Sequence, residues 1–212
     1  MKPCIFYLVR HGQSTANLHN VVGGHGDEAL TDLGLQQADE ARKIFAGTSF
    51  DAVYSSDLQR AYKTAEIIAG QPVPVDHQLT ALRERNFCQL EGRPIDEWFV
   101  INDTFYKNYG SLPLTERWQH SYSKTVETNA QLVDRFLGAL AGIAKDHAGQ
   151  KILIGTHAGP VRMTLAMLGY ADEIALGPGS FQNTAYVVLE YDGVRFKVQK
   201  VHGVTLGKAS AE

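Results

Sequence analysis

Short runs of hydrophobic residues alternate along the chain with segments of helical periodicity. The runs lie within residues 4–9, 52–56 and 151–157. Uninterrupted apolar runs of this length are typical of strands buried on both faces, as in a parallel sheet. After the first run, hydrophobic residues from Leu35 to Phe45 recur at the spacing of an amphipathic helix.

Capping and turn residues mark the ends of the predicted helices. Thr31 opens the first helix, and either Ser56 or Asp57 is expected to cap a second one, which Gly70 ends. Residues 73–75 are expected to form a further extended piece.

Toward the C-terminus the pattern predicts two helices and a hairpin. Hydrophobic residues along one face indicate a long helix over about residues 126–147, and a shorter one follows at 160–168. Residues 185–191 and 195–201 form two predicted strands joined across Asp192-Gly193, a dipeptide typical of tight hairpin turns.

Residues 82–125 differ from the rest of the chain because they show little periodicity and many aromatic side chains. We interpret residues 93–125 as an inserted cap of short helices and loops. The aromatic residues are Trp98, Phe99, Phe105, Tyr106, Tyr109, Trp118 and Tyr122. They fit either plain packing of the insertion or contact with a ring-containing ligand, and the sequence leaves both open.

Strands alternating with helices over the whole length predict an α/β fold, with a mostly parallel central sheet flanked by helices and a small inserted cap. At 212 residues the chain fits one domain, residues 1–212. In such sheets the functional site lies at the carboxyl ends of the strands. That rule directs attention to His11, to Ser55-Ser56 and to His157, which follow predicted strands.

Composition and charge narrow the classes of function. A formal net charge of −3 argues against a nucleic-acid partner, which calls for a concentrated basic face. No hydrophobic stretch approaches the ~20 residues of a membrane span, and the apolar start at residues 4–9 is too short for a signal peptide. Cys4 and Cys88 form no disulfide framework. We therefore expect a cytoplasmic protein without membrane association.

The tripeptide Arg10-His11-Gly12, at the end of the first predicted strand, suits phosphoryl chemistry. A neutral imidazole is a good nucleophile near neutral pH, and a guanidinium fork fits phosphate oxygens. The glycine would let a tetrahedral group approach the backbone. Taken alone, the tripeptide also fits a purely structural role. The histidine would then bond to a backbone carbonyl, and the arginine would form a surface ion pair.

Three further positions can complete such a site. His157, with the Ala158 amide at a helix start, can hold a phosphoryl oxygen. Arg60, about one turn into the second helix, can point back over the strand ends, and Glu84 or Glu91 can serve as a general acid. Taken singly, each of these residues also fits an ordinary structural or solvated role.

Zinc binding is the competing use of His11 and His157. Zinc hydrolases need three or four protein ligands, often with a local spacing such as HExxH, and the sequence contains no such spacing. Neighbouring arginines also oppose a dication. The sequence lacks Walker A and GxGxxG phosphate-binding loops as well. We expect no metal and no cofactor.

Taken together, five segments resemble the histidine phosphatase superfamily, also called the phosphoglycerate-mutase-like family. The first segment, LVRHGQSTAN (8–17), is similar to the signature in which the histidine becomes phosphorylated. The other four follow in the family's order and are LTDLGLQQA (30–38), VYSSDLQRAYKTAEII (53–68), LRERNFCQLEG (82–92) and GTHAGPVR (155–162). The resemblance covers nearly the whole chain, with residues 93–125 as the variable part.

The resemblance implies a role for each matching residue. Arg10 and Arg60 would bind the transferring phosphoryl group, and His11 would attack the phosphorus in line. His157 would bind the equatorial oxygens and stabilise their charge. Glu84 would protonate the leaving oxygen and later activate water against the phosphohistidine. No metal or cofactor is implied.

Further positions are implied less directly. Asn17 matches a family position that touches phosphate, and the stretch around Gly24 would wall the pocket. Arg85 follows Glu84 as in the mutases, where the matching arginine contacts the substrate carboxylate, and is a further candidate for substrate contact. Cys88 stands where the family usually has glycine, and Ala158 replaces a frequent glycine.

The resemblance favours a phosphatase that hydrolyses small phosphate monoesters, because the cap does not resemble the longer insertion of the family mutases. A cofactor-dependent phosphoglycerate mutase and a non-catalytic phospho-ligand binding module are the alternatives. The sequence leaves open the identity of the substrate, the oligomeric state, with a homodimer as one option, and the role of Cys88.

Overall fold

The computed structural model of the chain describes residues 2–97, 109–121, 123 and 125–207. These residues form a five-stranded sheet in the order β2-β3-β1-β4-β5. The strands are β1 (Cys4–Arg10), β2 (Ala52–Ser55), β3 (Lys151–Thr156), β4 (Phe181–Tyr191) and β5 (Phe196–Val204). The first three pair in parallel, and the β4–β5 hairpin adds antiparallel strands beside β1. The predicted α/β fold with a central sheet is confirmed, and its parallel part holds the strands that precede the candidate histidines.

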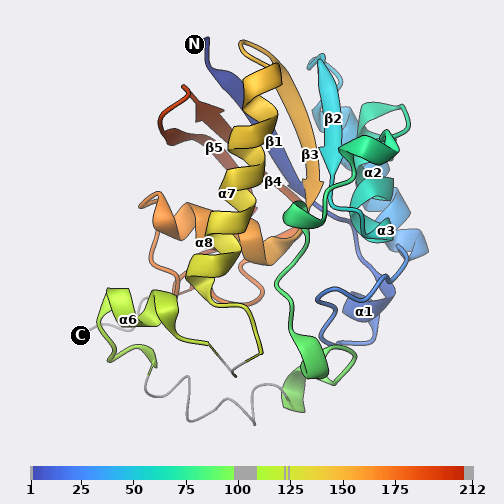
Figure 1. Cartoon of the computed structure of the whole chain (residues 1–212). Helices are drawn as coiled ribbons and strands as arrows, with labels where there is room; N and C mark the ends of the chain where they lie inside the picture. Colours follow the sequence, from blue (N-terminus) through green and yellow to red (C-terminus); the bar gives the residue numbers. More distant parts are fainter. Residues whose placement is uncertain (1, 98–108, 122, 124, 208–212) are drawn as a thin grey trace.

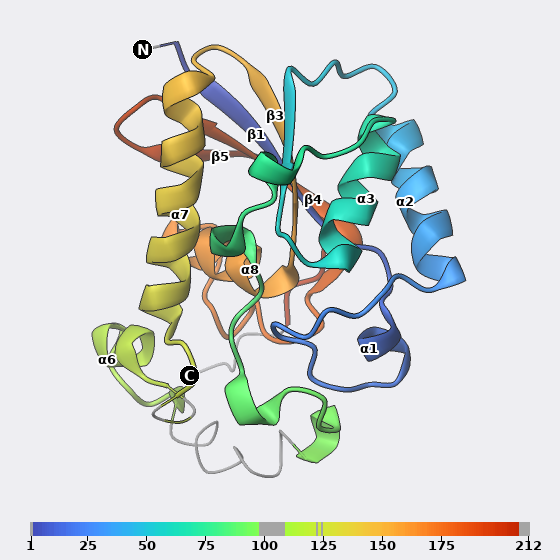
Figure 2. The same ribbon diagram turned by 45° about the vertical axis from the view of Figure 1, so that its right-hand side comes forward.

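Helices cover both faces of the sheet. In Figures 1 and 2, α2 (Asp32–Ile44) and α3 (Gln59–Ala69) lie on one face, and α7 (Asn129–Asp146) and α8 (Ala158–Met167) lie on the other. The short helices α1 (Thr15–Leu18) and α6 (Leu114–Gln119) lie beyond the carboxyl ends of the parallel strands (Figure 1). Single turns of 3₁₀ helix complete the described elements: η1 (Val75–His77), η2 (Thr80–Leu82) and η3 (Cys88–Leu90).

The alternation of side chains in β1 explains its unbroken apolar sequence. Phe6 and Leu8 point toward α7 and α8, where they share a core with Phe136. Val9 points toward α2 and α3 and belongs to a second core that includes Ala41. Because helices bury both faces of the strand, hydrophobic residues are favoured at successive positions rather than at every second one.

Two helices begin where a threonine side chain caps them. The Thr31 hydroxyl accepts a hydrogen bond from the Gly34 amide at 3.1 Å, as predicted for the start of α2. The long helix α7 begins at Asn129, later than predicted, because Thr128 forms a reciprocal capping box with Gln131.

The prediction that Ser56 or Asp57 caps α3 is wrong. The N-cap is Leu58, which makes no side-chain capping bond. The carboxylate of Asp57 instead accepts two bonds from the Arg83 guanidinium, at 2.7 and 2.6 Å. Residues 73–75 also do not join the sheet, because Val75 opens η1.

The predicted cap is described only in part. Residues 98–108, 122 and 124 lie outside the described residues, and the interpretation of most cap aromatics falls on them. The described part contains α6, and Trp118 on that helix packs against a cluster of Leu132, Val133 and Met163. Plain packing therefore explains this one aromatic.

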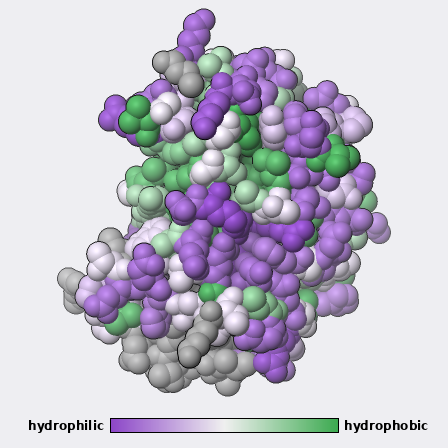
Figure 3. All heavy atoms as spheres, in the orientation of Figure 1, coloured by the Kyte–Doolittle hydropathy of each residue, from purple (hydrophilic) through white to green (hydrophobic). Residues whose placement is uncertain are grey.

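Hydrophilic residues cover most of the face shown in Figure 3, and hydrophobic residues gather mainly in its upper half, around α7. Within the described ranges, no helix is long and apolar enough to span a membrane.

Cys88, the first residue of η3, has a left-handed backbone with a φ of 51°. A non-glycine residue in this region carries roughly 1–2 kcal/mol of strain. The Cys88 sulfur lies 3.1 Å from Asn86 Oδ1 and 3.0 Å from the Thr125 carbonyl oxygen, so the thiol contributes contacts at a position that suits glycine.

We expect Cys88→Gly to be more stable than Cys88→Ala by about 1 kcal/mol, because both variants lose the thiol and only glycine relieves the strain. Urea unfolding of the two variants measures the difference. At ordinary backbone angles alanine is usually the more stabilising of the two residues. An alanine variant at least as stable as the glycine variant would therefore contradict this account.

Candidate active site

A pocket of about 660 Å³ lies where the carboxyl end of β1 meets the loop after α1, the first turn of α3 and the start of α8. Most residues predicted for the site line it, and these are Arg10, His11, Asn17, Gly24, Arg60, Glu84 and Arg85. His157 and Ala158 are not among the lining residues, although Gly159, the next residue along α8, is. The fold thus gathers residues that are far apart in the chain, from Arg10 to Pro178.

The His11 ring is held in one tautomer by its own loop. Its Nδ1 lies 2.6 Å from the Gly12 carbonyl oxygen. Because a carbonyl oxygen can only accept, Nδ1 carries the proton and Nε2 keeps its lone pair. Burial, reinforced by the charges of Arg60 and Arg10, holds the pKa of His11 well below its usual 6.5. The ring is therefore a neutral nucleophile near neutral pH.

His157 lies next to His11 and is completely buried. The two ring centroids are 5.2 Å apart. Neither ring nitrogen of His157 has a hydrogen-bond partner among the described residues. Burial is the main reason that its pKa lies well below 6.5, and Arg60 and His11 add to the effect. Unpaired buried polar atoms are costly, so this ring is suited to a ligand that accepts a hydrogen bond.

Arg10 and Arg60 are the two guanidinium groups whose charges act on His11. Arg10 donates from Nη1 to the Phe181 carbonyl, and its buried Nε has no partner among the described residues. Burial lowers the pKa of Arg10 to about 10, so the group stays charged at neutral pH. Arg60, with 2% of its surface exposed, points inward as predicted.

Loop contacts hold the Arg60 guanidinium in place. Nη2 donates to the Gly24 carbonyl at 2.7 Å, and Nη1 donates to the Gly26 carbonyl at 2.6 Å and to Glu28 at 2.7 Å. Burial lowers the pKa of Arg60, and the charge of Glu28 partly offsets that effect. The loop that walls the pocket and the predicted phosphate-binding arginine are thus one hydrogen-bonded unit.

Asn17 is oriented by bonds to its carbonyl oxygen. Oδ1 accepts from the Ser14 amide at 3.2 Å and from Asn183 Nδ2 at 3.3 Å. Asn183 also donates to the His11 carbonyl oxygen at 3.0 Å. These bonds leave the Asn17 amide nitrogen as the end available to donate to a ligand. Asn183 was not predicted from the sequence, because it lies in β4, far from every motif.

Glu84 is held by two backbone amides. Oε1 accepts from the Arg85 amide at 2.7 Å, and Oε2 accepts from the Gly159 amide at 2.9 Å. The carboxyl group lies so close to Gly159 that a Cβ there would meet Oε1 at 1.9 Å. A side chain at position 159 would therefore displace the Glu84 carboxyl group, which the Gly159 amide holds at the start of α8.

The structure gives a reason for glycine at position 12 that is separate from the predicted approach of a phosphate. A Cβ at Gly12 would lie 2.3 Å from the Gly34 carbonyl oxygen on α2. Glycine is needed there because two backbones cross closely, which is sufficient reason without any approach of a phosphate.

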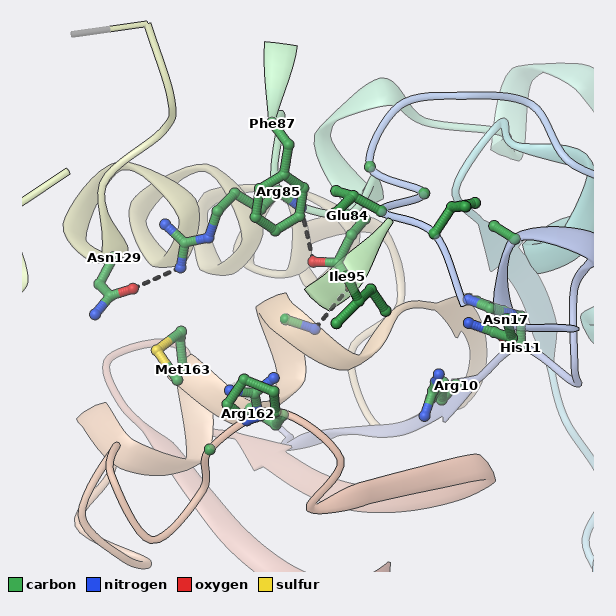
Figure 4. Close-up of a pocket in the computed structure, with 18 of the residues that line it drawn as sticks. Arg10, His11, Asn17, Glu84, Arg85, Phe87, Ile95, Asn129, Arg162 and Met163 are labelled. Atoms are coloured by element: carbon green, nitrogen blue, oxygen red, sulfur yellow. Dashed lines mark hydrogen bonds between the residues drawn. The ribbon is translucent and has the colours of Figure 1, made fainter. Parts of the chain in front are cut away.

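Arg85 lies at the other end of the pocket from His11 (Figure 4). Its guanidinium donates to the Glu127 carbonyl and, at 2.5 Å, to Asn129 Oδ1. Figure 4 also shows Arg162 and Met163, which reach the pocket from α8. Arg162 ends the segment GTHAGPVR (155–162), but no role was predicted for it, and Met163 lies just beyond that segment. Glu84 lies between the two ends, within reach of a group bound at either.

The arrangement combines a neutral nucleophile, two fixed cations and a carboxyl group around one cavity. Such an arrangement can bind an anion, attack it and move a proton to or from a neighbouring atom. Among the described residues, no three metal-ligating side chains gather into a cluster.

Comparisons with known proteins agree with this geometry. A sequence model of the histidine phosphatase superfamily (branch 1) matches residues 6–203. Phosphoglycerate mutase-like protein 4 of Arabidopsis thaliana is 34% identical over 160 residues, covering 73% of this chain and 66% of that protein. The uncharacterized phosphatase PhoE of Bacillus subtilis is 28% identical over 193 residues, covering 91% of this chain and 89% of that protein. Among solved structures, Bacillus stearothermophilus YhfR superposes with a TM-score of 0.78 at 28% identity, covering 95% and 98%.

The lowered pKa values of His11 and His157 predict a pH-dependent stability. Below pH 6.5 the unfolded rings bind a proton that the folded rings do not, so the free energy of unfolding falls as the pH falls. Each ring contributes about 1.4 kcal/mol per pH unit until the pH reaches its folded pKa.

Urea unfolding between pH 7 and 5 measures this slope. We expect His157→Gln to lose the part of this slope that one buried ring contributes. His19→Gln, at an exposed ring, should keep the wild-type slope. Equal slopes in wild type and His157→Gln would show that the buried ring is protonated in the folded protein.

Proposed function

Because this chain belongs to the histidine phosphatase superfamily, we propose that it is a phosphatase that hydrolyses phosphate monoesters through a phosphohistidine on His11. The observation that carries the proposal is the Nδ1 bond to the Gly12 carbonyl, which leaves Nε2 as the nucleophile in a pocket lined by Arg10 and Arg60.

In the first half of the reaction, the phosphoryl group binds between the two guanidinium groups. Nε2 of His11 attacks the phosphorus, the P–N bond forms, and the bond from phosphorus to the ester oxygen breaks. Glu84 gives its proton to that oxygen, and the alcohol leaves. His157 and the arginines stabilise the charge that develops on the equatorial oxygens.

In the second half, water replaces the alcohol beside Glu84. The carboxylate takes a proton from the water while the water oxygen attacks phosphorus, and the P–N bond breaks. Inorganic phosphate leaves, and both His11 and Glu84 return to their starting states. The same carboxyl group thus acts as acid and then as base.

A phosphoglycerate mutase is the second candidate, favoured by the name of the relative from Arabidopsis and by the Glu84-Arg85 pair. A mutase would use Arg85 on a substrate carboxylate. Here that guanidinium donates hydrogen bonds to the Glu127 carbonyl and to Asn129 Oδ1, away from His11. Phosphoglycerate given with bisphosphoglycerate separates the two: isomerisation indicates a mutase, and free phosphate indicates a phosphatase.

Substitution of the nucleophile tests the proposal directly. We expect His11→Ala to lower kcat by more than ~10³-fold and to abolish the acid-labile phosphoryl label, because no phosphohistidine can form. His19→Ala, at an exposed ring, should keep both signals. Retained phosphate release in His11→Ala would sink the phosphatase mechanism, and ligand binding without turnover in the wild type would favour the non-catalytic binding module.

The far part of the pocket suggests the kind of leaving group. A volume of about 660 Å³ falls in the ~300–1,000 Å³ range of sites for drug-sized ligands. The hydrophobic and aromatic residues that line the pocket are Ala16, Val21, Val22, Phe87, Ile95, Tyr109, Met163, Ile174 and Pro178. We propose that the preferred monoesters carry a bulky, partly apolar alcohol.

A series of alkyl phosphates from methyl to hexyl tests this preference. Since a buried methylene is worth about 0.8 kcal/mol, kcat/KM should rise by up to ~4-fold for each one that enters the pocket. Phe87→Ala should flatten the series, and Val194→Ala, at an exposed position, should not. A flat wild-type series would refute an apolar leaving-group site.

A further inference from the structure

Arg135, on α7, uses every N–H donor of its guanidinium within the protein. Nε and Nη2 donate to the two carboxylate oxygens of Glu127, each at 2.8 Å. Nη1 donates to the Ala81 carbonyl at 2.9 Å and to the Arg83 carbonyl at 3.1 Å. Nη2 also donates to the Glu84 carbonyl at 3.2 Å. These bonds match the five donors of the group.

The carbonyls that Arg135 binds belong to the segment 81–84, which leads to the proposed acid. The remaining carbonyl, that of Leu82, accepts from the Thr156 hydroxyl at 2.9 Å. Thr156 is the last residue of β3 and directly precedes His157. Four successive carbonyls of a segment outside the sheet are therefore held by side chains from α7 and β3.

Glu127 extends this connection beyond Glu84. Its carboxylate, paired with Arg135, also lies 3.4 Å from the Asn86 amide, and its own amide lies 3.4 Å from the Asn86 carbonyl. The Arg135–Glu127 pair therefore contacts the backbone on both sides of Glu84. The side chain of Arg135 is 23% exposed and is not among the residues that line the pocket.

We propose that Arg135 is a positioning residue that fixes the Glu84 carboxyl group for proton transfer, an inference that rests on the proposed phosphatase function. The carboxyl group is anchored at its tip by the Arg85 and Gly159 amides. Arg135 anchors the backbone from which that side chain starts. A shift of ~1 Å at a reacting group can cost ~10²-fold in rate, and this pair holds the segment where such a shift would arise.

The dependence of the rate on the leaving group separates positioning from mere stability. p-Nitrophenolate leaves without a proton, whereas an alkoxide needs one. We expect Arg135→Gln to lower kcat/KM for an alkyl phosphate by ~10–100-fold and for p-nitrophenyl phosphate by less than ~3-fold. The plot of log kcat/KM against leaving-group pKa therefore becomes steeper. A loss of folded protein would lower both substrates equally.

Arg135→Lys keeps the charge but loses the planar fork, so it should show most of the same leaving-group effect. Arg195→Lys, at an exposed arginine in the β4–β5 turn, is the matched control and should show none. Urea unfolding shows whether Arg135→Gln folds. If it does not, the leaving-group dependence is measured on Arg135→Lys and Glu127→Gln instead.

The double variant with Glu84→Gln completes the experiment. If Arg135 acts through the carboxyl group, Arg135→Gln should change the alkyl rate by less than ~3-fold once Glu84 is replaced. An equal loss for both leaving groups, or an additive loss in the double variant, would overturn the positioning role. The proposed function fails separately, when wild-type protein forms no phosphohistidine on His11.

Discussion

Two guanidinium groups and two imidazole rings share one buried space, and desolvation decides the state of each. The arginines remain charged because their intrinsic basicity is high, whereas burial and the same arginines keep His11 and His157 neutral. Within this group only Arg60 is paired with a carboxylate, Glu28. The result is a cavity with positive charge beside a neutral imidazole ring, an arrangement that suits an anionic ligand.

The fold meets this requirement through the geometry of its parallel strands. β1 and β3 are neighbours in register, so Arg10 pairs with Thr156 and the two following histidines emerge side by side. Arg60 arrives from α3, and the loop it binds closes the pocket wall. The carboxyl group comes from segment 81–84, outside the sheet, whose carbonyls accept hydrogen bonds from side chains.

The histidines and Glu84 are held in place in different ways. Strand pairing positions the histidines, so their separation is as rigid as the sheet. Glu84 has no such support, and its place depends on the fork of Arg135 and on the amides of Arg85 and Gly159.

The sequence by itself determined the α/β fold, and most of the residues it predicted for the site do line the pocket. Buried strands, helix periodicity and the Arg-His-Gly and Thr-His-Ala blocks are local features, so they can be read in order along the chain. The wrong cap predicted for α3 shows the limit, because Asp57 suits capping locally and a distant partner, Arg83, takes its carboxylate. Only the tertiary structure decided the direction of Arg85, the reasons for Gly12 and Gly159, and the contacts of Arg135 and Asn183. The physical reason is that each depends on hydrogen bonds or close approaches between segments remote in sequence, and local patterns carry no information about such partners.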